Sequence, residues 1–143
     1  TYNEIDNLQL LVAAIHEQLP EADILVVDDN SPDGTGDWCD QKSADDGRVH
    51  CLHREGKLGL GTATIAAMKY SIEHDYDYMP NMDADFSHHP RYLQAMVEGM
   101  DADGQPACDC MIGSRYVPGG GTEGWPLKRR IAVVRFAAIA YLS

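Results

Sequence analysis

The sequence predicts an α/β fold in which a mostly parallel sheet is flanked by helices. Short apolar runs of the strand type alternate with helical patterns four times along the 143 residues. The first run, residues 24–27, is a continuous β-branched and leucine stretch, as in strands buried on both faces. Turn-forming or glycine-rich segments follow the runs. This alternation is typical of a Rossmann-like, doubly wound layer in a single domain.

Each element has its own signal. Leucine, valine and isoleucine recur at helical spacing over residues 5–19, and Pro20 closes that helix. Further helices are expected over residues 35–46, 62–74 and 90–100 and from about residue 127, and strands over residues 24–27, 49–52, 76–82 and 108–112. Because a helix precedes every strand, we expect a first strand to be missing just upstream of Thr1.

Charge is unevenly distributed and excludes some functions. Residues 1–110 hold 22 acids and 6 bases, whereas residues 111–143 hold 1 acid and 5 bases. The acidic part argues against nucleic-acid binding, and the basic part suits phosphates or an anionic membrane surface. No signal peptide is visible, and residues 131–142 are too short to span a bilayer.

The four cysteines show neither a C-x-x-C motif nor a zinc spacing with histidine. Cys108 and Cys110 would share one strand face, which predicts buried free thiols of a reducing compartment.

Asp83-Ala84-Asp85 is the most informative motif. Side chains at i and i+2 of an extended segment point the same way, so both carboxylates could hold one hard cation. Mg²⁺ or Mn²⁺ held by few carboxylates takes its other ligands from water and substrate phosphates, which indicates a nucleotide-diphosphate substrate. A D-x-D also arises by chance among 23 acids, so the prediction depends on the accompanying motifs.

Asp28 and Asp29 follow a buried strand, where a carboxylate can accept from a ribose or a base. Alternatively one or both cap the next helix, a role for which Asp33 is the better candidate. The loop around Lys57 could bring backbone N–H groups and an ammonium to a diphosphate, or could simply need glycine for positive φ angles.

Basic residues follow the last predicted strand. Arg115 and the tail residues Arg129 and Arg130 could bind phosphate, although a solvated charge run is the ordinary alternative. His88 and His89 are better explained as turn-shaping residues than as metal ligands.

These motifs together resemble the polyprenyl/dolichyl-phosphate mannose synthases of glycosyltransferase family 2. The resemblance covers nearly the whole chain and is carried by T-Y-N-E at residues 1–4, V-D-D-N-S-P-D-G-T at 27–35, K-L-G-L-G-T-A at 57–63, M-D-A-D-F-S-H-H-P at 82–90, G-S-R-Y-V at 113–117 and G-W-P-L-K-R from residue 124. It implies a GT-A-type fold that lacks its first strand and its C-terminal part.

The resemblance also implies roles for individual residues. Residues lining the nucleoside pocket would be Tyr2, Glu4, Val27 and Asp29. Asp83, Ala84 and Asp85 would contact the ribose, the diphosphate and the divalent cation (Mg²⁺ or Mn²⁺). Asp85 would be the direct metal ligand. Arg115 and Arg129 would bind the acceptor's phosphate. Ser87 replaces a glutamine that is common in relatives, which leaves the second protein ligand open.

The expected activity is inverting transfer of mannose from GDP-mannose to a polyprenyl phosphate, catalysed with Asp85, Arg115 and Arg129. The lipid acceptor implies peripheral association with the cytoplasmic face of a membrane, where residues 128–142 could lie at the interface or pack as a core helix. Two alternatives remain open: a family-2 transferase that uses UDP-glucose or another donor, and a non-catalytic nucleotide- or metal-binding module.

Overall fold

The computed structural model describes residues 1–102, 105–117 and 120–121. The chain divides into a first unit, Thr1–Asp109, and a second unit, Cys110–Ser143. That all 143 residues form one glycosyltransferase domain stays a prediction.

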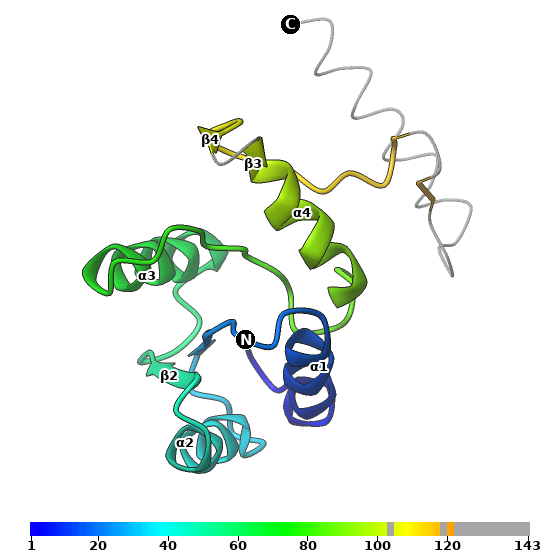
Figure 1. Ribbon diagram of the computed structural model, residues 1–143. Coiled ribbons are helices and arrows are strands. Elements are labelled where there is room, and N and C mark those ends of the chain that lie inside the picture. Colours follow the sequence, from blue (N-terminus) through cyan, green and yellow to red (C-terminus); the bar gives the residue numbers. More distant parts are fainter. Residues whose placement is uncertain (103–104, 118–119, 122–143) are drawn as a thin grey trace, which may run out of the picture. The chain divides into compact units, whose positions relative to one another are not determined.

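The first unit contains the regular elements drawn in Figure 1. In chain order they are α1 (Ile5–Gln18), β1 (Ile24–Asp28), α2 (Thr35–Asp45), β2 (Val49–His53), α3 (Leu60–Glu73), the 3₁₀ helix η1 (Pro90–Tyr92), α4 (Leu93–Met100), β3 (Asp101–Ala102) and β4 (Gln105–Pro106). Strands β1 and β2 pair in parallel, with Ile24 opposite Val49 and Asp28 opposite His53, and β3 pairs with β4 antiparallel. The predicted α/β class is confirmed.

The main core lies where α1 and α2 pack on the β1–β2 sheet (Figure 1). Its buried side chains come from all four elements and are Leu8, Val12, Val26, Cys39 and Val49. A short parallel pair of this kind has few hydrogen bonds, so most of its stability comes from this apolar contact.

A second apolar cluster is formed by other side chains of α1 together with the first residue of α4. Leu11, Ile15 and Leu93 are its buried members. Residues Met82, Ala84 and Phe86 pack against it, so the segment after α3 is attached to the fold through alternate side chains.

Asp33 ties the first turns of two helices together. Its carboxylate accepts from the Ile5 N–H at 3.2 Å, from the Thr35 N–H at 3.0 Å and from the Thr35 hydroxyl at 2.6 Å. The hydroxyl of Thr35 and the N–H groups of Thr35 and Ile5 thereby lower the pKa of Asp33. Asp33 thus accepts from the first N–H of α2, as a capping side chain would, but the N-cap position itself is Gly34 and not Asp33. Gly34 follows it at φ +92°, a left-handed conformation that glycine adopts without strain.

Two predicted strands are wrong. Residues 76–82 run without regular secondary structure, because among the described residues no strand lies alongside to supply ladder hydrogen bonds, and Pro80 has no N–H to give. Residues 108–112 form no strand either. Cys108 and Cys110 are free, as predicted, but Cys108 is only partly buried and Cys110 is exposed, since no sheet face covers them.

The described residues of the second unit, 110–117 and 120–121, consist of turns and irregular backbone. The helix predicted from residue 127, and with it Lys128, Arg129 and Arg130, lies outside the described residues. Within the part of the chain that the structure describes, no helix has the length and apolar character needed to cross a membrane.

Candidate functional site

A pocket of about 460 Å³ in the first unit is the candidate site. Apolar side chains of α1, residues Ile24–Val27 of β1 and one side of α3 form most of its wall. Six of the predicted site residues line it together: Tyr2, Glu4, Val27, Asp83, Ala84 and Asp85. Chain segments more than 50 residues apart in sequence thus meet around one cavity, as the motif order led us to expect.

The N-terminal residues reach this pocket because Thr1 joins the free edge of β1. Its amino group donates to the Val27 carbonyl at 2.5 Å, and the Asp29 N–H donates to the Thr1 carbonyl at 3.0 Å. This bridge sets Tyr2 and Glu4 beside the carboxyl end of β1, the edge where parallel α/β sheets bind ligands.

The acidic motif projects two carboxylates to the same side. Along residues 81–87 exposed and partly buried side chains alternate. Met82, Ala84 and Phe86 point inward onto the second apolar cluster, while Asp83 and Asp85 are exposed. The predicted i, i+2 arrangement is therefore found, although the segment is an anchored turn rather than the end of a strand.

Asp85 is held as a carboxylate by its own turn. The Ser87 N–H donates to Asp85 Oδ1 at 2.9 Å. This bond and one from the Ser87 hydroxyl lower the pKa of Asp85. Phe86, between Asp85 and Ser87, has φ +60°, a left-handed conformation that is rare for a bulky residue. Such a conformation costs energy and persists only where the surroundings enforce it.

Asp83 interacts with the first of the two histidines. Its N–H donates to His88 Nδ1 at 3.2 Å, and the same nitrogen lies 3.7 Å from Asp83 Oδ2. His89 Nδ1 accepts from the Arg91 N–H at 3.2 Å and so caps η1. Both histidines shape the turn, as predicted.

The donor chemistry of the motif fits Mg²⁺ or Mn²⁺. Both ions prefer oxygen ligands, and Asp85 is ionised at neutral pH. In the described chain, Asp83 and Asp85 have no third His, Cys, Asp or Glu near enough to complete a site from protein groups alone. A cation held here would take its other ligands from water and substrate oxygens.

The second acidic pair divides into two roles. Asp28 is 2% exposed, and its carboxylate accepts from the N–H and the hydroxyl of Ser31 at 3.2 and 2.5 Å, which makes it a structural residue of the turn. Asp29 Oδ1 lies 3.0 Å from Arg54 Nε. Asp29 is not part of the pocket lining, so its place in the nucleoside site stays a prediction.

Arg54 is a residue that the sequence reasoning missed. Its side chain is 8% exposed, and Nη2 donates to the Thr62 hydroxyl at 3.0 Å at the start of α3. The buried Nη1 has no hydrogen-bond partner among the residues that the structure describes. The available signal was its position, one residue after the end of β2.

Lys57 lies beside the pocket residue Tyr2. Its ammonium is 3.6 Å from the centre of the Tyr2 ring, a cation–π contact. The loop therefore places a positive charge near the pocket, as we had considered. Gly59 has φ +95°, so the glycine requirement of the loop also holds.

The two arginines expected to bind the acceptor lie outside the first unit. Arg115 lies in a turn of the second unit and is partly buried, and residues 108–112 just before it do not form the predicted strand. Arg129 lies outside the described residues.

Comparisons with known proteins agree with the resemblance of the motifs. The model of glycosyl transferase family 2 matches residues 1–142. The chain is 47% identical to undecaprenyl-phosphate mannosyltransferase of Micrococcus luteus over 92% of its own length and 52% of that protein. It is 46% identical to polyprenol monophosphomannose synthase of Mycolicibacterium smegmatis over 92% of its length and 48% of that protein.

These matches define the class: the chain belongs to glycosyl transferase family 2. It spans about half the length of the curated relatives it matches.

Proposed function

We propose that this protein is an inverting glycosyltransferase that moves mannose from GDP-mannose to a polyprenyl phosphate. The observation that carries the proposal is the pocket at which Asp83 and Asp85 meet Tyr2, Glu4 and Val27. The names of two relatives, a mannosyltransferase and a phosphomannose synthase, support the sugar and the lipid acceptor.

The pocket suits a sugar nucleotide in size and composition. Ligand sites of this kind have volumes of about 300–1,000 Å³ and mostly apolar walls with a few placed polar groups. Here the apolar wall comes mainly from α1 and β1, and the polar groups include the carboxylates of Glu4, Asp83 and Asp85. Lys57, above the Tyr2 ring, supplies a positive charge for the diphosphate.

Asp85 and Asp83 would hold the divalent cation, Mg²⁺ or Mn²⁺, against the diphosphate of the donor. Such a cation offsets the negative charge that the departing nucleotide gathers. The bonds from Ser87 keep Asp85 ionised and fix the direction of its carboxylate. The other carboxylate oxygen is therefore oriented before the donor binds.

The acceptor needs orientation more than activation. A phosphate oxygen of the polyprenyl phosphate is already anionic near neutral pH, and it attacks the anomeric carbon of mannose while the bond to GDP breaks with both electrons leaving on GDP. Attack from the opposite face inverts the anomeric configuration. We assign Arg115 and Arg129 to hold the acceptor's phosphate, since arginine pairs with phosphate through two parallel hydrogen bonds.

Because the acceptor is a lipid, the enzyme must act at a membrane surface, and we propose that this is the cytoplasmic face. Lys128, Arg129 and Arg130 precede an apolar run and could bind anionic lipids. Flotation with anionic vesicles tests this: a triple alanine variant at these positions should float less than the parent, and undiminished flotation would count against an electrostatic anchor.

The direct test is transfer of radiolabelled mannose from GDP-mannose to a short polyprenyl phosphate by the complete gene product. We expect transfer that a chelator abolishes and that Mn²⁺ or Mg²⁺ restores, with a β-linked product. Asp85→Ala should lower the rate by about 10²–10³-fold or more. Asp77→Ala is the matched control, because Asp77 is exposed and lies outside the pocket lining.

Other outcomes point to the alternatives. A larger thermal shift by UDP-glucose than by GDP-mannose would replace the donor. Metal-dependent binding of GDP without any transfer would indicate a binding module. Full chelator-sensitive activity of Asp85→Ala would refute the assignment of the cation.

A further inference from the structure

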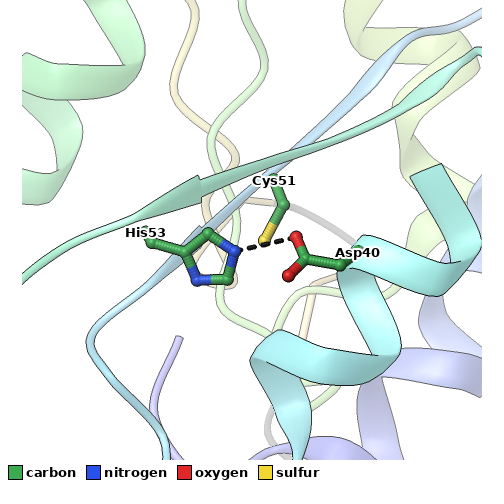
Figure 2. A group of neighbouring side chains, drawn as sticks. All are labelled: Asp40, Cys51 and His53. Carbon is green, nitrogen blue, oxygen red and sulfur yellow. Dashed lines mark hydrogen bonds and ion pairs between the residues drawn. The ribbon is translucent and has the colours of Figure 1, made fainter. Parts of the chain in front are cut away.

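A second group of metal-ligand side chains lies away from the pocket, where α2 packs on β2. Figure 2 shows Asp40 of α2 pointing at Cys51 and His53 of β2. One ligand atom from each residue lies within 4.8 Å of the other two. His53 Nε2 and Asp40 Oδ1 are 2.8 Å apart. In the part of the chain that the structure describes, this is the one such group of three.

The arrangement follows from the fold and not from a sequence motif. Residues 51 and 53 are i and i+2 on a strand, so their side chains share the face that α2 covers. Asp40 joins them from the middle of α2. The sequence showed no zinc spacing because the third residue is contributed by the packing of two elements.

A buried carboxylate lies near one of the two ligands on β2. Asp28, 2% exposed, has Oδ2 4.0 Å from His53 Nδ1, the ring nitrogen that faces away from Asp40. This separation is too long for a hydrogen bond, so Asp28 contributes negative charge near the ring and does not fix its tautomer.

Cys39, which is fully buried in the same part of the fold, does not belong to the group. The thiol of Cys39 donates to the His50 carbonyl, with 3.7 Å between sulfur and oxygen. Cys39 is therefore engaged inside the core, and Cys51 is the sulfur that lies beside Asp40 and His53.

The chemistry of the three ligands selects the ion. A thiolate, an imidazole and a carboxylate together suit Zn²⁺, whereas Mg²⁺ prefers oxygen alone. Bond lengths of about 2.0 Å to N and O and about 2.3 Å to S put tetrahedral ligand atoms roughly 3.3–3.6 Å apart. The side chains of His53 and Asp40 are 49% and 58% exposed, so they can make the small adjustment from their present spacing.

We propose that Asp40, Cys51 and His53 bind Zn²⁺, with water as the fourth ligand. The ion links α2 to β2 on the outside of the main core and is distinct from the cation at Asp83 and Asp85. Since a ligand that binds the folded state raises its stability, Zn²⁺ also raises the melting temperature.

The test titrates the metal-free full chain with Co²⁺, a spectroscopic substitute for Zn²⁺. We expect one equivalent to bind with the near-ultraviolet absorption of a cobalt–thiolate bond, and Zn²⁺ to displace it. Cys51→Ser should abolish this absorption. His53→Ala and Asp40→Ala should weaken binding at least about tenfold, as loss of metal-site partners does.

Two controls make the result specific. Cys110→Ser removes an exposed thiol elsewhere and should leave the absorption unchanged. Asp85→Ala should also leave it unchanged, so failure of the zinc site and failure of the transferase proposal can be told apart. Because Asp40 is largely exposed, Asp40→Asn tests the site without disturbing the core. An absent cobalt–thiolate band, or a band that persists in Cys51→Ser, would overturn the proposal.

Discussion

Leu11→Ala is the substitution that best tests how the acidic motif is supported. Leu11 is 3% exposed and belongs to the apolar cluster on which Met82, Ala84 and Phe86 rest. Removing three carbons from a buried site costs about 2.4 kcal/mol at ~0.8 kcal/mol per carbon. The residual cavity raises the expected loss in the free energy of unfolding to about 3–4 kcal/mol.

Leu10→Ala is the matched control, since Leu10 is the neighbouring residue of α1 and is 65% exposed. It should change stability by less than about 0.5 kcal/mol. Urea unfolding followed by circular dichroism measures both. With a slope of about 1–3 kcal/mol per molar urea, Leu11→Ala should lower the midpoint by about 1 M or more.

The same substitution should loosen the motif itself. Because Met82, Ala84 and Phe86 lose part of their support, hydrogen exchange of residues 82–87 should become faster in Leu11→Ala and not in Leu10→Ala. Equal losses of stability in the two variants, or unchanged exchange in that segment, would refute the packing argument.

Two further predictions concern the turn before α2. Gly34→Ala should lower the free energy of unfolding by about 1–2 kcal/mol, because Gly34 has φ +92° and no neighbouring atom but only the backbone conformation opposes a side chain there. Gly47→Ala is the control: Gly47 has an ordinary φ and equal space, so thermal unfolding should show a neutral or slightly stabilising effect. The pKa of Asp33 is lower in the folded protein than in the unfolded chain, so on acidification the unfolded state binds the proton first. The contribution of Asp33 to the free energy of unfolding is therefore complete above pH 3.8, the unfolded value, and is lost as the pH falls through the lower folded pKa. Asp33→Asn should therefore flatten the dependence of melting temperature on pH in that range, and an unchanged slope would contradict this assignment.

Local patterns predicted the elements whose signals are contained in their own residues. The apolar periodicity of α1 and the β-branched run of β1 are present within a residue or two of the expected bounds. Residues 76–82 have a similar apolar character, but a strand also requires a partner, and none lies beside them in the described residues. Periodicity alone carries no information about pairing.

The candidate site also combines features that local spacing predicts with features that only tertiary contacts determine. The spacing of Asp83 and Asp85 predicted that both face one way, because that depends on neighbouring backbone alone. The hydrogen bonds of Asp28 to Ser31 are local to one turn, whereas the pairing of Asp29 with Arg54 depends on a tertiary contact. The group of Asp40, Cys51 and His53 was invisible in the sequence for the same reason.

Paramagnetic broadening by Mn²⁺ in the presence of GDP-mannose tests the central claim most directly. In amide NMR spectra of the full chain, substoichiometric Mn²⁺ should broaden residues 83–87 most strongly and Tyr2, across the pocket, next, and Asp85→Ala should remove this broadening. Unperturbed signals from residues 83–87, with broadening centred elsewhere, would contradict the assignment of Asp83 and Asp85 as the residues that hold a divalent cation against a sugar nucleotide.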